Sequence, residues 1–188
     1  MNRMIAVLTL TAAMFMATFV SAQEVNKELV GQAANPAIES LTAVLKGRVP
    51  SGIQLLEDLA ITRPSPDVPP QLAELSGVWT GEFHSERSGR VMAEWVYVLE
   101  KLAPDSVTIV SMGIGRDTGS RDGPRGNAGQ LWATRYENLK PSRIAPLEVT
   151  NTRGTIYTFE LKDGRLSVRN VSASGGTPWV GKFTRITW

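Results

Sequence analysis

Cysteine is absent from this sequence, and histidine occurs once, at His84. Without cysteine the chain has no disulfide, no thiolate metal site and no cysteine nucleophile. One histidine gives little basis for a metal centre or a serine triad, and no Gly-x-Ser-x-Gly motif is present. The 20 basic and 18 acidic side chains nearly balance, without a long run of one sign, so nucleic acid is not an expected partner. We therefore predict no catalytic residue, no metal and no cofactor.

The N-terminus differs in composition from the rest of the chain. Residues 1–3 include a positive charge, residues 4–20 are almost wholly apolar, and Val20-Ser21-Ala22 has the small-residue form of a cleavage site. This pattern predicts a signal peptide over residues 1–22 and an exported, periplasmic or secreted protein. A retained membrane anchor is the alternative. We expect no stable membrane insertion after cleavage, because the apolar run is at the short limit for a span and no stop-transfer charges follow it.

Aromatic residues are also missing from residues 23–76, whereas every aromatic residue beyond the leader lies at or after Trp79. Aromatic side chains supply much of the apolar area of a core. We therefore predict a packed domain over residues 75–188, preceded by a helical appendage over 23–62 and a Pro-rich linker over 63–74.

The helical interpretation of the appendage depends on two apolar stripes and a capping signal. Asn35-Pro36 offers an N-cap followed by Pro at the first helical position. The stripes are Ile38, Leu41, Val44 and Leu45, then Ile53, Leu56, Leu59 and Ala60. Such stripes usually pack on their own domain, and we expect weak docking or loose order. Binding to a protein partner through residues 23–62 is the alternative.

From Gly77 onward, short β-branched and aromatic runs alternate with turn residues. We predict eight strands, at residues 77–84, 90–102, 106–114, 130–137, 147–150, 155–161, 165–172 and 178–187. Asp163-Gly164 is a strong hairpin signal between the sixth and seventh. The fold class is therefore mainly β, an antiparallel meander of about eight strands that closes into a small barrel. A two-sheet sandwich explains the same pattern.

The two ends of this domain carry a family resemblance. Leu75-Ser76-Gly77-Val78-Trp79 resembles the Gly-x-Trp opening of the lipocalin and calycin superfamily, and Gly181-Lys182-Phe183-Thr184-Arg185 resembles the last-strand arginine of such barrels. The resemblance covers residues 75–188 and implies a distant bacterial lipocalin-like barrel. It also implies that Arg185 lies across Trp79 as a structural latch, an arrangement that a cation–π contact would stabilise.

Inward-facing aromatic residues are the candidates for a ligand pocket. By the strand alternation these are Trp95, Tyr97, Tyr157 and Phe159. The competing interpretation is that they fill a closed core. By the same alternation Glu100 faces outward as an ordinary surface charge.

The loop over residues 115–129 is long for a hairpin and carries Arg116, Arg121 and Arg125. Long loops in compact domains tend to be functional or mobile, so these arginines are candidates for contacts to an anion at a barrel mouth, and a solvated loop is the alternative. Asp117-Thr118-Gly119 matches the aspartic protease motif, but it has no second copy and charged neighbours. The leading functional hypothesis is an exported barrel that holds a small apolar or amphipathic ligand. The alternative is a protein-interaction or envelope accessory module that uses the N-terminal segment.

Overall fold

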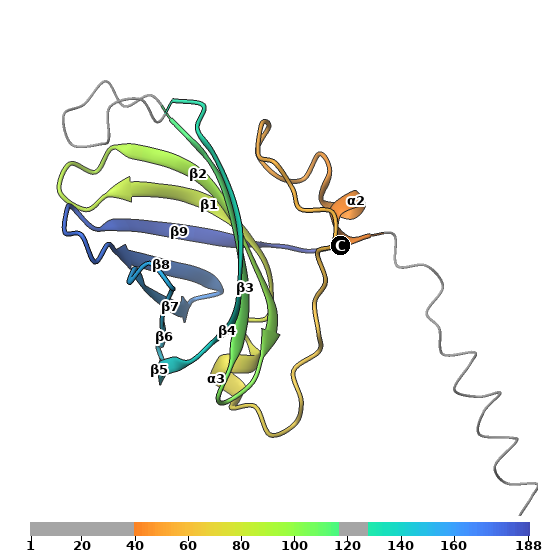
Figure 1. Cartoon of the computed structure of the whole chain (residues 1–188). Helices are drawn as coiled ribbons and strands as arrows, with labels where there is room; N and C mark the ends of the chain where they lie inside the picture. Colours follow the sequence, from red (N-terminus) through yellow and green to blue (C-terminus); the bar gives the residue numbers. More distant parts are fainter. Residues whose placement is uncertain (1–39, 117–127) are drawn as a thin grey trace, which may run out of the picture. The chain divides into compact units, whose positions relative to one another are not determined.

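A computed structural model describes residues 40–116 and 128–188, and nine of its strands form one antiparallel sheet (Figure 1). The strands are β1 (Gly77–Ser85), β2 (Val91–Leu102), β3 (Val107–Gly115), β4 (Leu131–Leu139), β5 (Pro141–Ile144), β6 (Leu147–Thr150), β7 (Ile156–Lys162), β8 (Arg165–Val171) and β9 (Trp179–Ile186). Their order is β4-β3-β2-β1-β9-β8-β7-β6-β5, so β1 pairs with both β2 and β9. The sheet curls into a nearly closed barrel whose edge strands, β4 and β5, are linked in the chain through Lys140.

The predicted fold class is confirmed: the described chain is a mainly β, antiparallel meander with short helical pieces before it. The structure adds a ninth strand, β5, which sequence analysis missed. This strand has four residues and begins with Pro141, which cannot donate to a ladder hydrogen bond. A short edge strand of this kind carries almost no periodic signal.

The inner face of the barrel is packed with aromatic rings. Phe83 is at the centre of this cluster, with ring centroids 5.6 Å from Trp95, 6.2 Å from Tyr97 and 5.3 Å from Phe183. All three pairs are edge-on, the arrangement that the ring quadrupoles favour. Because side chains alternate along a strand, the residues between these rings face outward.

A second apolar cluster lies on that outer face. Val96 and Val98 of β2 are fully buried although they point out of the barrel, because residues 41–61 cover them. The covering side chains include Leu41 and Leu45 of helix α2 (Leu41–Leu45), together with Ile53 and Leu59. The stripe in this part of the appendage is therefore packed against the barrel. The sequence of β2 is apolar on both faces, which is typical of a strand that is buried on both sides. Sequence analysis did not use this signal.

Polar contacts fix the same covering segment. Arg135 of β4 donates to both carboxylate oxygens of Glu100, at 2.9 and 3.0 Å, and pairs with Asp58. The Glu100 carboxylate also accepts the backbone N–H of Ala60 at 3.0 Å. Glu100 faces outward as expected but is buried, so its interpretation as an ordinary surface charge was wrong. A buried carboxylate needs such partners, and here they connect the covering segment to β2 and β4.

The second apolar stripe of the appendage does not form a helix in the structure. Residues 46–62 contain turns and extended chain, and α2 ends before Gly47. Gly47 and Gly52 have φ of +78° and +90°, and Pro50 between them cannot donate a helical hydrogen bond. These three residues break the helical path, while Ile53 and Leu59 still reach the barrel surface.

The Pro-rich segment closes the base of the barrel. Helix α3 (Pro70–Ala73) begins with a proline, which is favourable at a first helical position. Val68, Leu72 and Leu75 from this segment belong to the inner aromatic core. One end of the barrel is therefore filled by side chains, which directs attention to the other end.

Candidate functional site

Trp79 and Arg185 meet at the base, where β1 begins. They are direct partners in the ladder between β1 and β9, and the guanidinium carbon lies 4.4 Å from the centroid of the Trp79 ring. The guanidinium also donates to the backbone carbonyls of Ser76, at 2.7 Å, and of Glu74. Gly77 makes room for it, because a Cβ there would lie 2.9 Å from Nη1 of Arg185. The structure thus brings the two predicted latch residues together, joining the first strand to the last.

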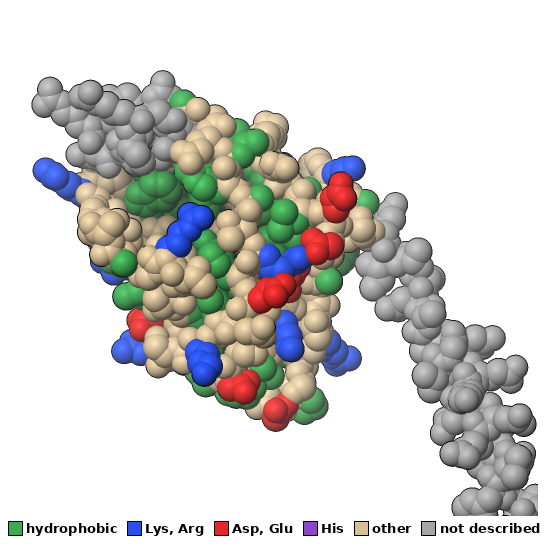
Figure 2. Space-filling view, in the orientation of Figure 1, with side chains coloured by type: hydrophobic (Ala, Val, Ile, Leu, Met, Phe, Trp, Pro, Cys, Tyr) green, Lys and Arg blue, Asp and Glu red, His purple; other side chains and the backbone are tan. Residues whose placement is uncertain are grey.

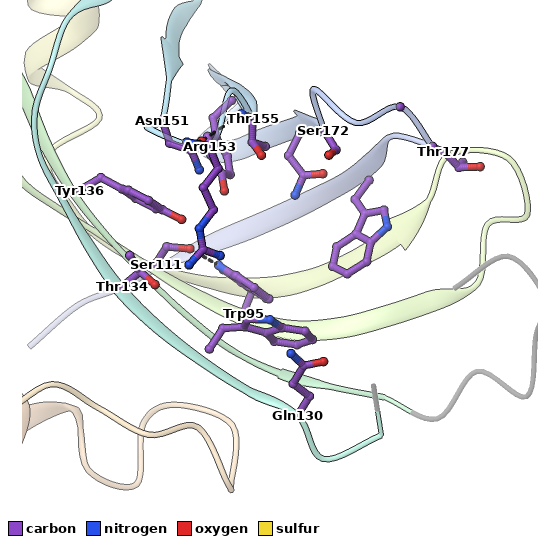
Figure 3. A pocket seen from close by; sticks show the side chains of 16 residues that line it. Trp95, Ser111, Gln130, Thr134, Tyr136, Asn151, Arg153, Thr155, Ser172 and Thr177 are labelled. Carbon is purple, nitrogen blue, oxygen red and sulfur yellow. Dashed lines mark hydrogen bonds between the residues drawn. The ribbon is translucent and has the colours of Figure 1, made fainter. Parts of the chain in front are cut away.

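A cavity of about 620 Å³ opens toward the other end of the strands (Figure 3). Its walls come from the inner faces of β2, β3, β4, β7, β8 and β9 and from the turns that flank β7 and β9. Five aromatic residues and one cation contribute: Trp95, Trp132, Trp179, Tyr136, Tyr157 and Arg153. The other lining residues described by the structure are Ser, Thr, Asn, Gln and Gly. The volume is within the range of small-molecule sites.

Two of the tryptophans form one wall. Trp95, Gly113 and Trp132 lie side by side across β2, β3 and β4, and the two indole centroids are 5.2 Å apart at an angle of 34°. Gly113 is required for this packing, because a Cβ there would lie 2.1 Å from the Trp95 ring. The Trp95 N–H donates to the Ser111 hydroxyl at 2.9 Å, which fixes the ring plane. The sequence therefore builds a rigid aromatic wall from three adjacent strands.

The floor of the cavity is made of tyrosines. Tyr136 of β4 and Tyr157 of β7 have ring centroids 6.1 Å apart. Burial, and then the neighbouring Tyr136, raise the pKa of Tyr157 above its ordinary value. Tyr97 lies below them, fully buried, and burial raises its pKa as well.

The hydroxyl of Tyr97 is a buried polar atom without a hydrogen-bond partner among the described residues. The Ser111 hydroxyl is close enough to lower the pKa of Tyr97 by hydrogen bonding, but the geometry of the two groups falls short of a formed hydrogen bond. Buried hydroxyls are normally paired, and an unpaired one carries a desolvation cost. Ser111, Tyr136 and Tyr157, the groups that act on its pKa, all line the cavity. The unpaired phenol is therefore located directly beneath the floor.

Arg153 contributes the only charged side chain among the described lining residues. It belongs to the turn between β6 and β7, where the Asn151 side chain accepts the N–H groups of Arg153 and Thr155, both at 2.9 Å. Asn151 is itself buried, so the turn has a fixed backbone shape. In Figure 3 the Arg153 side chain extends from this turn into the cavity. Sequence analysis left this segment as the connection between two predicted strands and did not single out the arginine.

The four aromatic residues proposed from sequence fall into two pairs. Trp95 and Tyr157 line the cavity. Tyr97 and Phe159 lie deeper, are almost completely buried, and pack edge-on with centroids 5.3 Å apart. Alternation along the strands identified the side chains that face the inside of the barrel. It did not show which of them line the cavity and which lie in the core, because that depends on which end of the barrel is filled by residues 68–75.

The arginines proposed as anion contacts are placed differently. Arg116 pairs with Glu94 on the outer side of the barrel and does not line the cavity. Arg121 and Arg125 lie outside the described residues, as does the Asp117 motif. The turn arginine, Arg153, is the described cation that lies in the cavity.

Other kinds of site are not found in the described parts of the chain. No cluster of three or more His, Asp or Glu side chains able to hold a metal occurs in residues 40–116 and 128–188. His84 is outside the cavity lining and contacts the Gly89 carbonyl at 3.1 Å. Within the same described ranges, no helix is long and apolar enough to cross a membrane.

Comparison with known proteins gives similarities only at the level of solved structures. No protein-family model matches the chain, and no curated protein matches it. A de novo designed fluorescence-activating β-barrel is 18% identical over 61% of this chain and 96% of that one, with a TM-score of 0.42. A redesigned β-barrel, mFAP1, bound to DFHBI, is 14% identical over 62% of this chain and 100% of that one, with a TM-score of 0.45. Another redesigned β-barrel is 11% identical over 69% of this chain and 100% of that one, with a TM-score of 0.44.

Proposed function

We propose that this protein binds a small amphipathic molecule in the open cavity of its barrel. The observation that carries the proposal is the cavity itself, with a volume of about 620 Å³ and walls from six strands. Sites that hold small molecules are concave, rich in aromatic surface, and contain a few placed polar groups. The cavity is concave and has aromatic walls, and its described lining contains more polar side chains than aromatic ones.

The lining favours an amphipathic ligand over a purely apolar one. The described lining residues include five aromatic side chains but no Val, Leu, Ile or Met. The remaining side chains are mostly hydroxyls and amides, which would lose their hydrogen bonds to water beneath a wholly apolar ligand. A ligand with both a flat apolar part and polar groups satisfies both kinds of surface.

The family assignment is part of this proposal. We infer that the barrel is a distant lipocalin-like member of the calycin superfamily, since Gly77, Trp79 and Arg185 occupy the positions that the resemblance implies. The contact of Arg185 with Trp79, at 4.4 Å, supports the inference. Small barrels serve many functions, so this assignment supports the ligand only through the cavity.

Export is the second part of the proposal. The positive start, apolar stretch and cleavage pattern of residues 1–22 support secretion or release into a periplasm. Such a protein would act as a non-catalytic carrier or accessory of the envelope. The competing hypothesis of partner docking has less surface available, because Leu41, Leu45, Ile53 and Leu59 are buried against the barrel.

The experiment that tests binding is native mass spectrometry of the protein purified without detergent from the exported fraction of its own cells. A Thr134→Trp variant fills the cavity, and Thr184→Trp on the outer side of β9 is the matched control. We expect an extra mass on the wild type and on Thr184→Trp that is lost on denaturation and absent from Thr134→Trp. A bare wild-type mass, unchanged by incubation with the small-molecule extract of the same cells, would overturn the proposal.

A further inference from the structure

The charge of the described cavity lining is unbalanced. Arg153 lines it, and no described Asp or Glu does. Among the described residues, no carboxylate lies within 4.0 Å of the Arg153 guanidinium. By contrast Arg116, Arg135 and Arg169 each pair with a carboxylate on the outer side of the barrel. Arg153 thus faces the cavity with no carboxylate partner among the described residues.

The fold holds the backbone that carries this arginine. The buried Asn151 side chain holds the backbone on both sides of Arg153, so the guanidinium is presented from a fixed turn. Gly154 next to it has φ of +77°, which suits glycine at the tight bend. Figure 2 has the orientation of Figure 1. It shows hydrophobic side chains in a hollow of the surface, with a basic side chain over them.

The rings around the cavity are arranged to accept a flat group. Trp95 and Trp132 make one wall, Trp179 enters from β9, and Tyr136 and Tyr157 lie at the floor. Indole and phenol faces stack on planar rings with a gain beyond buried area. An acyl chain is usually held by aliphatic side chains, and the described lining has none.

We infer that the cavity selects a planar aromatic ring that carries one anionic group, with the ring against Trp95, Trp132 and Trp179 and the anion at Arg153. This inference rests on the proposed function, because it names the class of ligand for the same cavity. A guanidinium offers a fork of donors that suits carboxylate, sulfonate or phosphate oxygens. A neutral sugar or an aliphatic chain could contact the aromatic rings or the amide side chains, but it would make no ion pair with Arg153.

Two fluorescent probes that share one ring system provide the test. 8-Anilinonaphthalene-1-sulfonate carries a sulfonate, and N-phenyl-1-naphthylamine is its uncharged counterpart. Both are titrated into the protein purified from the exported fraction, into Arg153→Gln, and into Arg165→Gln as the matched control. Arg165 is exposed at the far end of the strand pair β7 and β8 and does not line the cavity.

We expect both probes to bind the wild type, with the sulfonate binding more tightly and weakening as salt is raised. Arg153→Gln should weaken the sulfonate about tenfold and leave the neutral probe within about twofold, because only the charge-assisted contact is lost. Arg165→Gln should change neither probe. Far-ultraviolet circular dichroism checks that both variants are folded.

The other outcomes separate this inference from the proposed function. If both probes bind and Arg153→Gln changes them equally or not at all, the anionic class is wrong while ligand binding stands. If neither probe binds the wild type but native mass spectrometry shows a bound molecule, the aromatic anion is again the wrong class and the proposed function survives. If neither probe binds and the native mass is bare, both fail.

Discussion

Arg185 on the last strand lies over Trp79 on the first, with 4.4 Å between the guanidinium carbon and the centroid of the ring. The Trp79 N–H donates to the Leu75 carbonyl at 2.9 Å, and the guanidinium donates to the carbonyl of Ser76. One pair of side chains therefore ties together β1, β9 and the segment that enters the barrel. The first and last strands of the chain, which are neighbours in the sheet, are joined at this point.

Replacing this arginine should weaken the barrel without altering the cavity. Arg185→Gln removes the cation–π contact and the donors to two carbonyls, and we expect the free energy of unfolding to fall by about 1 to 2 kcal/mol. Arg185→Lys keeps the charge but loses the fork, so its effect should be intermediate. Urea unfolding measures both. Arg165→Gln, an exposed control, should stay within about 0.5 kcal/mol of the wild type. Equal stability of Arg185→Gln and the wild type would show that the contact is incidental.

The covering segment should behave as part of the folded unit. Leu45 has no exposed surface and packs on the outer face of the barrel. Leu45→Ala should lower the free energy of unfolding by about 2 to 4 kcal/mol, since it removes buried methyl groups and leaves a void. Lys46→Ala next to it is exposed and should change stability by less than about 0.5 kcal/mol. If Leu45→Ala leaves the free energy of unfolding by denaturant unchanged, residues 41–61 are only loosely attached to the barrel.

The Asp58 carboxylate should titrate at low pH. The hydrogen bond from Arg135 holds the pKa of Asp58 below its usual value. In the unfolded chain the pKa returns to about 4, so the contact stabilises the fold above that pH. This contribution is lost as the pH falls from about 4 through the folded-state pKa. Carboxyl-carbon NMR titration should therefore show a depressed pKa for Asp58 that rises in Arg135→Gln. A titration of Asp58 that is the same in both proteins would contradict the pairing.

The floor of the cavity offers a test of hydrogen-bond satisfaction. Tyr97→Phe removes a buried hydroxyl that has no partner among the described residues, so stability should be unchanged or rise by up to about 1 kcal/mol. Ser111→Ala removes the acceptor of the Trp95 N–H and should lower stability by about 1 to 2 kcal/mol. Ser111→Ala should therefore lower the midpoint of thermal unfolding. Tyr97→Phe should raise this midpoint or leave it unchanged. A clear loss of stability in Tyr97→Phe would show that the hydroxyl is paired.

Much of the barrel could be predicted from sequence because side chains alternate between the two faces of a strand and turn residues separate the strands. In β2, Trp95, Tyr97 and Leu99 form the inner face that alternation predicts, and the Asp163-Gly164 hairpin lies between β7 and β8. The motif around Trp79 and the arginine near the C-terminus located the first and last strands. Local spacing carries this information directly.

The rest could not be predicted because it depends on contacts distant in sequence. The burial of Val96 and Glu100 follows from a segment some forty residues earlier, which covers them only in the folded chain. The role of Arg153 depends on which end of the barrel is plugged by Leu72. Neither the covering of β2 nor the filling of one barrel end produces a periodic pattern in the sequence.

The five tryptophans allow the central claim to be tested in one measurement. Trp95, Trp132 and Trp179 line the cavity, Trp79 is in the latch at the base, and Trp188 is exposed at the C-terminus. Proton–nitrogen NMR of the indole N–H groups, recorded during titration with 8-anilinonaphthalene-1-sulfonate, reports on all of them together. The account predicts saturable shifts of the three cavity indoles, with Trp79 and Trp188 unmoved. Shifts centred on Trp188, or no saturable shift of the three cavity signals, would contradict it.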